Sequence, residues 1–140
     1  MSRIFWDTNL FLYLFKGSAQ YGRRVAEFRE AMLRRGDLPV TSTLTLGEVL
    51  VKPVKEGDTR LQREYSAAIP AAAVLLPFDE KAAQVYAQLR SDKSVRAPDA
   101  IQLACAGSFG VDLFVTNDSR LHALPVQGIQ FITSLERLPI

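Results

Sequence analysis

The feature that most constrains this chain is an alternation of short apolar segments of β character with longer segments of helical spacing. Strands that are joined through helices run parallel, because each crossover returns the chain to the same end of the sheet. Such a sheet is covered by helices on both faces. The pattern therefore predicts an α/β fold with strands at Arg3–Trp6, Leu38–Thr41, Ala73–Leu76, Leu113–Val115 and, as a last edge strand, Gln130–Ile132.

Helices are expected between these strands, where apolar residues recur every three or four positions and capping residues stand at the segment ends. They are predicted at Leu10–Lys16, Gln20–Arg35, from Ser42 or Thr43 to Val51, Thr59–Ile69, from Asp79 to Leu89, and Pro98–Ser108. Pro53 is expected to end the third of them, because proline lacks the N–H that a helix interior uses. The stretch Lys52–Asp58 is accordingly predicted to be a charged turn.

The composition fits one soluble domain spanning residues 1–140. Apolar residues make up 48% of the chain and charged residues 23%, a balance that excludes a disordered or fibrous protein. Apolar stretches such as Ile69–Pro77 are too short to cross a bilayer, and no cleavable signal is visible, so we expect a cytoplasmic protein without a membrane partner. The single cysteine, Cys105, excludes a disulfide framework and indicates a buried thiol.

Two aspartates follow predicted strands at the point where each strand ends. Asp7 comes directly after Ile4–Trp6, and Asp118 follows the strand that ends near Val115. In parallel sheets, sites form at the carboxyl ends of the strands, so both side chains should lie at the same edge. Either aspartate alone also fits a helix cap or a turn. Asp112 precedes its predicted strand and is expected at the opposite edge.

Two further carboxylates, Glu48 and Asp99, lie in predicted helices. Glu48 stands inside the apolar run Leu44–Leu50, where a carboxylate must be exposed at a groove, paired, or bound to a cation. Asp99 follows Pro98 at a helix start, where the helix dipole favours an anion in any case. An exposed helix position for Glu48 and a helix-start role for Asp99 therefore remain as alternatives.

Converging carboxylates repel one another unless a divalent cation neutralises them. Oxygen ligands without a histidine or cysteine set select Mg²⁺ or Mn²⁺ rather than Zn²⁺, and His122, the only histidine, is expected in a loop. A metal held in this way suits hydrolysis of a phosphate ester. The polar residues beside the strand-end aspartates either support the metal site or act as turn residues: Thr8, Asn9, Thr116 and Asn117.

Four segments resemble the PIN-domain nucleases, and among them the VapC-type toxins of prokaryotic toxin–antitoxin pairs. They are Trp6–Asn9, Thr41–Glu48, Arg96–Ala100 and Val115–Asp118. The resemblance implies a PIN-like α/β/α sandwich with a central parallel sheet of four to five short strands. It also implies that Asp7, Glu48, Asp99 and Asp118 bind one or two Mg²⁺ or Mn²⁺ ions, and that water attacks RNA at a site lined by Thr8, Asn9, Thr116 and Asn117.

The resemblance extends to partners. Family members usually form homodimers and bind an antitoxin whose C-terminal segment covers the site; the helical regions Leu10–Arg35 and Leu44–Ile69 carry apolar faces for both contacts. Basic residues expected near the mouth of the site either contact RNA phosphates or belong to an ordinary solvated surface: Lys52, Lys55, Arg60, Arg96 and Arg120.

The sequence thus predicts a Mg²⁺- or Mn²⁺-dependent endoribonuclease, and two other functions compete with it. A magnesium phosphatase or phosphoacceptor domain also places acids at strand ends, but it commonly has a second acid two residues after its nucleophile, where Asn9 stands here. A PIN module that binds RNA or a partner without cutting is the alternative outside catalysis, and the intact carboxylates argue against it.

Overall fold

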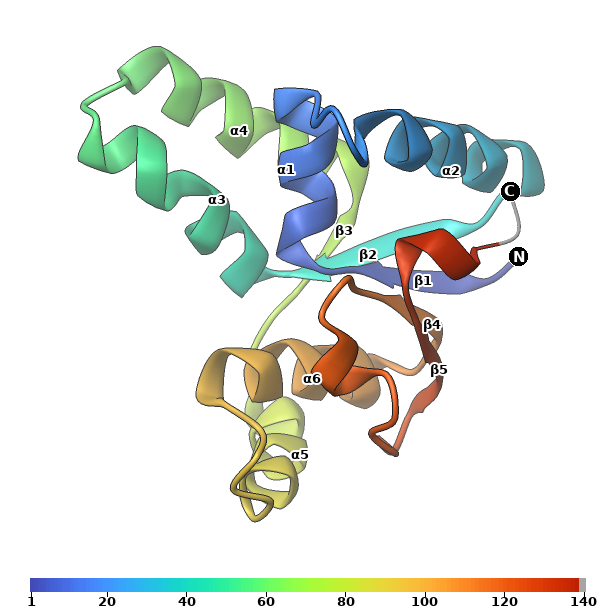
Figure 1. The fold of residues 1–140 in the computed structure, drawn as a ribbon. Coiled ribbons are helices and arrows are strands. Elements are labelled where there is room, and N and C mark those ends of the chain that lie inside the picture. Colours follow the sequence, from blue (N-terminus) through green and yellow to red (C-terminus); the bar gives the residue numbers. More distant parts are fainter. Residues whose placement is uncertain (139–140) are drawn as a thin grey trace.

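The computed structural model describes residues 1–138, and across these residues five strands form one parallel sheet (Figure 1). The strands are β1 (Arg3–Trp6), β2 (Leu38–Ser42), β3 (Val74–Leu76), β4 (Val111–Val115) and β5 (Ile129–Thr133). Their order in the sheet is β3-β2-β1-β4-β5, and every neighbouring pair is parallel. The predicted α/β fold with a central parallel sheet is confirmed, and β5 is an edge strand as expected.

Helices cover both faces of the sheet, with α1 to α4 on one face and α5 and α6 on the other (Figure 1). Their bounds are α1 (Thr8–Lys16), α2 (Gly22–Arg35), α3 (Thr43–Lys55), α4 (Thr59–Ala72), α5 (Glu80–Arg90) and α6 (Ala97–Phe109). Short 3-10 helices follow at Ser119–Leu121 and Leu135–Arg137. Within residues 1–138, none of the helices has the length and apolar character needed to span a membrane.

The expected helix end at Pro53 is wrong, because α3 continues through this proline to Lys55. Pro53 is buried in the last turn of the helix, and its carbonyl oxygen accepts hydrogen bonds from the Asp58 N–H at 2.9 Å and from Gln62 Nε2 at 3.3 Å. Burial of the ring and these contacts with the turn and with α4 offset the missing helical hydrogen bond. The predicted turn Lys52–Asp58 is therefore confined to residues 56–58.

The two apolar layers follow from the alternation of side chains along the central strand β1. Ile4 and Trp6 face α1 and α2, where the Trp6 ring lies 5.8 Å from the ring of Phe28. Phe5 faces the opposite layer and stacks on Phe114 of β4 at 4.6 Å between ring centroids. Because β1 is paired on both sides and packed on both faces, the backbone of the residue that follows it, Asp7, is held in a fixed position.

Two minor expectations concern Asp112 and Cys105. Asp112 lies at the start of β4 rather than before it, and its Oδ2 accepts a hydrogen bond from the Arg3 N–H at 2.8 Å. It therefore lies at the amino end of the sheet, as expected, away from Asp7. Cys105 is buried and free, which also agrees with the expectation.

The aromatic stack at the centre of the sheet should dominate the stability of the fold. We expect Phe114→Ala to lower the free energy of unfolding by about 3–5 kcal/mol, because the ring is fully buried and the cavity left behind cannot collapse. Urea unfolding followed by Trp6 fluorescence measures this change. Phe131→Ala is the matched control: its ring is 69% exposed on β5, so a change within about 0.5 kcal/mol is expected. Equal losses for both variants would contradict this assignment of the core.

Candidate active site

All four predicted carboxylates border one cavity of about 620 Å³ at the carboxyl end of the sheet. They come from four separate segments of the chain, namely the end of β1, the middle of α3, the start of α6 and the loop after β4. The residues lining the cavity are Asp7, Thr8, Asn9, Leu12, Tyr13, Tyr21, Glu48, Arg96, Pro98, Asp99, Gln102, Asn117, Asp118 and Arg120. Three of the four predicted supporting residues are among them, whereas Thr116 lies buried next to Asp7.

Asp7 is held by two hydrogen bonds at the junction of β1 and α1. Its Oδ1 accepts from the Thr8 N–H at 2.8 Å, as the cap of α1, and its Oδ2 accepts from Thr116 Oγ1 at 2.7 Å. Burial raises the pKa of Asp7; the two hydrogen bonds lower it, and the charges of Glu48 and Asp99 raise it further, so that the pKa ends above its usual value. The site therefore holds a carboxylate where its negative charge is unfavourable.

Glu48 faces the same cavity from α3. Its Oε1 accepts a hydrogen bond from Thr8 Oγ1 at 2.6 Å, which ties the helix to the start of α1. The apolar run around Glu48 is explained by the packing of α3, since its neighbour Val49 is buried in the core beside α1 and α4. Of the possibilities open for Glu48, the structure shows an exposed position at a groove with one polar partner.

Asp99 and Asp118 are paired with arginines. Arg120 donates to Asp118 through Nε, at 2.9 Å from Oδ1, and through Nη2, and the same Nη2 lies 3.8 Å from Asp99 Oδ2. Arg96 Nε lies 3.8 Å from the same oxygen of Asp99. The hydrogen bonds from Arg120 lower the pKa of Asp118 below its usual range. The two halves of the site thus differ, because hydroxyl groups support Asp7 and Glu48 whereas guanidinium groups neutralise Asp99 and Asp118.

A buried polar layer beneath the cavity was missed by the sequence analysis. Gln102, Ser42, Thr41 and Thr45 are each less than 5% exposed and hydrogen-bond to one another below Thr8. The sequence contains a signal for this layer, since Gln102 is the one polar residue in the apolar run Ile101–Ala106 of α6. A buried amide in an apolar helix face needs partners, and these come from α1, α3 and β2.

The loop after β4 places the remaining predicted residues. Thr116 Oγ1, which donates to Asp7, also accepts from the Asp118 N–H at 3.1 Å. Asn117 Oδ1 accepts from the Leu135 N–H at 3.2 Å, while its buried Nδ2 has no hydrogen-bond partner within the described part of the chain. His122 closes the short 3-10 helix, and a ring nitrogen contacts the Thr116 carbonyl oxygen at 2.9 Å.

The five predicted RNA contacts fall into two groups. Arg96 and Arg120 line the cavity. Lys52, Lys55 and Arg60 do not line it; they lie on the α3–α4 hairpin beyond Glu48, where Lys52 pairs with Glu56 at 3.9 Å and Arg60 pairs with Glu64 at 3.1 Å. The hairpin points away from the sheet (Figure 1). Lys52 lies one helical turn beyond Glu48 on α3, whereas Lys55 and Arg60 lie nearer the turn that joins α3 to α4.

The donor set fits a hard divalent cation in kind and in location. Four carboxylates border the cavity without a histidine or cysteine among them, and Asp7 is destabilised by Glu48 and Asp99, which a cation would relieve. Within residues 1–138, however, no three acidic, histidine or cysteine side chains are already gathered closely enough to hold an ion. Binding would therefore require the carboxylate side chains to turn toward one another.

A parallel α/β domain with an acidic cavity at the carboxyl edge of its sheet is the class that fold and site define. A family model for the PIN domain matches residues 4–127, and the chain belongs to this family. PIN domains are typically metal-dependent nucleases. No protein with a curated description matches the chain in sequence.

Several solved structures share the fold. A chain of VapBC2 from Rickettsia felis, bound to a promoter DNA fragment, superposes with a TM-score of 0.76 at 14% identity, covering 94% of this chain and 98% of the other. DNA-bound VapBC from Salmonella typhimurium superposes with a TM-score of 0.67 at 22% identity, covering 96% of this chain and 99% of the other. VapBC-5 from Mycobacterium tuberculosis, described as a member of a family of toxin–antitoxin systems, superposes with a TM-score of 0.63 at 24% identity, covering 94% of this chain and 98% of the other. At these identities the similarity establishes the fold.

The raised pKa of Asp7 makes a prediction about stability. The pKa of Asp7 is higher in the folded protein than in the unfolded chain, where it is about 3.9. The free energy of unfolding therefore falls as the pH rises from the unfolded pKa through the folded one, because the folded protein then holds an unfavourable charge. In buffer with a chelator, Asp7→Asn should therefore raise the urea midpoint at pH 7, and its advantage should shrink toward pH 4. The asparagine can still cap α1.

Asp118→Asn is the matched control with the opposite sign. The pKa of Asp118 is lowered, so its ionised form stabilises the fold above the unfolded pKa, and this variant should lower the urea midpoint slightly at pH 7. An Asp7→Asn midpoint at or below that of the wild type at pH 7 would show that desolvation and repulsion do not dominate at this carboxylate.

Proposed function

We propose that this chain is a Mg²⁺- or Mn²⁺-dependent endoribonuclease, the toxin of a toxin–antitoxin pair, acting in the cytoplasm as a single PIN domain over residues 1–140. One observation carries the proposal: carboxylates from four distant segments, Asp7, Glu48, Asp99 and Asp118, border the same cavity. Each has an ordinary structural explanation in its own segment, but those explanations do not require the four to meet.

The residues of the site divide the work of RNA cleavage. When bound, Mg²⁺ or Mn²⁺ at the four carboxylates would activate water and stabilise the charge that develops on the phosphate oxygens. Thr116 and Thr8 hold Asp7 and Glu48 in place through their hydroxyl groups. Asn117 holds the loop after β4 in place, because its Oδ1 accepts a hydrogen bond from the Leu135 N–H at 3.2 Å.

The walls of the cavity suit a single-stranded nucleic acid. Arg96 and Arg120 are exposed at the cavity and provide positive charge for phosphate groups, which the acidic residues alone would repel. Tyr13 and Tyr21 line the same cavity with their ring centroids 4.8 Å apart, and aromatic faces of this kind stack on unpaired bases. An extended strand laid across the cavity would contact both sets of residues.

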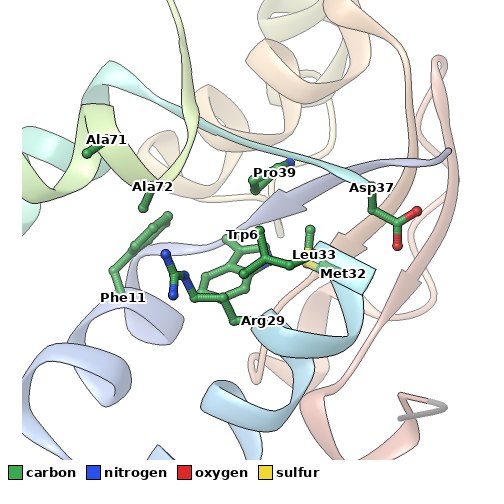
Figure 2. Close-up of a pocket in the computed structure, with 9 residues that line it drawn as sticks. All are labelled: Trp6, Phe11, Arg29, Met32, Leu33, Asp37, Pro39, Ala71 and Ala72. Carbon is green, nitrogen blue, oxygen red and sulfur yellow. The ribbon is translucent and has the colours of Figure 1, made fainter. Parts of the chain in front are cut away.

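We also propose an antitoxin partner, because the similar solved chains come from VapBC toxin–antitoxin complexes. A second, apolar hollow of about 210 Å³ lies between α2 and the end of α4 (Figure 2). Buried Trp6 and Phe11 form part of its lining, and Leu33, which is 62% exposed, stands beside it. An apolar side chain of the antitoxin would bury this surface, with Arg29 at its border; Asp37, also in the lining, is already paired with Arg35 at 2.8 Å.

We propose that the protein forms a homodimer through the second helical region with apolar faces, Leu44–Ile69, which forms the α3–α4 hairpin. Val51 and Val54 of α3 are 50% and 58% exposed, which leaves an apolar surface on this helix. We expect the isolated protein to elute as a dimer at micromolar concentration and Val54→Asp to shift it toward monomer, since an aspartate would have to be desolvated at the interface. Light scattering on the eluting peaks measures the mass; a monomeric wild type would refute the dimer.

The first test of the proposed function is cleavage of a mixed RNA pool in the presence of Mg²⁺ or Mn²⁺. We expect the wild type to cut, and both Asp7→Asn and an excess of chelator to abolish cutting, because a ligand or the ion itself is then missing. Asp112→Asn is the matched control: this aspartate lies at the opposite end of the sheet, so its variant should cut like the wild type.

The competing function predicts a different result in the same experiment. A folded wild type that retains RNA on a filter in the presence of either ion, yet releases no fragments, would identify a binding module in place of a nuclease. Release of inorganic phosphate from small phosphate esters, without RNA fragments, would instead indicate a magnesium phosphatase.

A further inference from the structure

The buried amide of Gln102 is the centre of a hydrogen-bond network that ends at Glu48. Gln102, on α6, is 4% exposed. Its Nε2 lies 3.1 Å from Thr8 Oγ1 and 2.8 Å from Thr45 Oγ1, and its Oε1 contacts Ser42 Oγ. Thr8 Oγ1 in turn lies 2.6 Å from Glu48 Oε1. Hydrogen bonding in this network is decided by counting the hydrogens that each group can give.

At the far end of the network, the Thr41 hydroxyl group contacts a backbone carbonyl group. Thr41 Oγ1 lies 2.8 Å from the Trp6 carbonyl oxygen, which can only accept, so the single hydroxyl hydrogen of Thr41 is used there. The Thr41 and Thr45 hydroxyl groups lie 2.9 Å apart, and the hydrogen between them must therefore come from Thr45. Thr45 has no hydrogen left to give to Thr8, although their oxygens are only 3.2 Å apart.

The orientation of the Gln102 amide follows from the same count. With Nε2 toward Thr8 and Thr45, each threonine accepts one amide hydrogen, and Ser42 donates to Oε1. If the amide were flipped, its oxygen would take the hydroxyl hydrogens of Thr8 and Thr45. The contacts of 2.6 Å to Glu48 and 2.9 Å to Thr41 would then contain no hydrogen while Glu48 is ionised.

We infer that Gln102 is a positioning residue that directs the single hydroxyl hydrogen of Thr8 onto Glu48 and so fixes this carboxylate at the cavity. The amide occupies the acceptor side of Thr8. Of the two acceptors that remain within reach of the threonine hydrogen, Glu48 Oε1 at 2.6 Å is nearer than Thr45 Oγ1 at 3.2 Å and carries the negative charge, so the hydrogen goes to the carboxylate. A hydroxyl–carboxylate hydrogen bond is charge-assisted and short, which agrees with the 2.6 Å contact.

The expected consequence is a more ordered metal ligand, and this step rests on the proposed function. Glu48 is exposed on α3, and Thr8 is the only side chain seen to hydrogen-bond to it in residues 1–138. A glutamate without such support has several rotamers available. Groups that orient a ligand from behind typically change metal affinity by about 10–100-fold when they are removed.

The experiment measures Mn²⁺ binding by calorimetry with the full-length protein. Gln102→Met keeps the length of the side chain but removes both donors, and we expect it to raise the Mn²⁺ dissociation constant about tenfold or more. Gln84→Met is the matched control, since Gln84 is exposed on α5 and outside the network, and it should bind like the wild type. Wild-type affinity in Gln102→Met would overturn the inference.

A double-mutant cycle separates action through Thr8 from a general packing effect. Thr8→Val removes the hydroxyl group that links Gln102 to Glu48, so the combined variant should bind Mn²⁺ no more weakly than Thr8→Val alone. Losses that simply add would mean that Gln102 acts independently of Thr8, and the inference would be wrong. Thermal unfolding of each variant checks folding; if Gln102→Met does not fold, Gln102→Asn, whose shorter amide cannot span the same contacts, replaces it in the cycle.

The network itself has a signature that needs no metal. In the wild type, the side-chain amide hydrogens of Gln102 should exchange slowly with water in NMR spectra and show cross-peaks to Thr8 and Thr45, and a fast-exchanging amide would overturn the inference. A wild type that binds no Mn²⁺ would refute the proposed function, and the inferred role with it. If the wild type binds Mn²⁺ and both Gln102→Met and Thr8→Val bind it as tightly as the wild type, the inference alone is refuted.

Discussion

The burial of a carboxylate at the carboxyl end of the sheet, beside other acidic side chains, is the constraint on which the rest of the structure depends. Asp7 is the most affected, because it is largely desolvated and sits near both Glu48 and Asp99. The fold tolerates this charge by fixing its surroundings: β1 is the central strand, packed on both faces, and Asp7 accepts two hydrogen bonds where the strand passes into α1. The apolar core therefore supplies the stability that the acidic site consumes.

The site balances its charge in two ways. Neutral hydroxyl donors leave the charge of Asp7 and Glu48 intact and available to a cation, whereas Arg120 neutralises Asp118 and lies near Asp99. Any cation that binds all four carboxylates must compete with this guanidinium. In the proposed nuclease, Arg120 would exchange a carboxylate partner for a phosphate group of the substrate.

Local pattern predicted the strands, most helices and the placement of Asp7 and Asp118 at one edge of the sheet, because strand alternation, caps and strand ends can be recognised from neighbouring residues. Glu48 and Asp99 were added to this site by the resemblance to PIN-domain nucleases, since nothing in their own segments shows that they meet the other two. Pro53 departed from the prediction because burial against α4, a tertiary effect, decides whether a helix continues through a proline. The network around Gln102 could not be predicted either. Its members lie up to 94 residues apart in the chain, and their hydrogen bonds exist only once α1, α3 and α6 have packed.

The hydrogen count at Gln102 also bears on how such a chain can diverge. With every hydrogen in the network assigned to one acceptor, a neutral substitution at a single position leaves a buried donor or acceptor without a partner. Positions 8, 42, 45 and 102 should then drift as a group, by paired exchanges that preserve the total of donors and acceptors. Related sequences should therefore either keep the whole polar layer or replace all of it with apolar residues, and chains with only part of it should be rare.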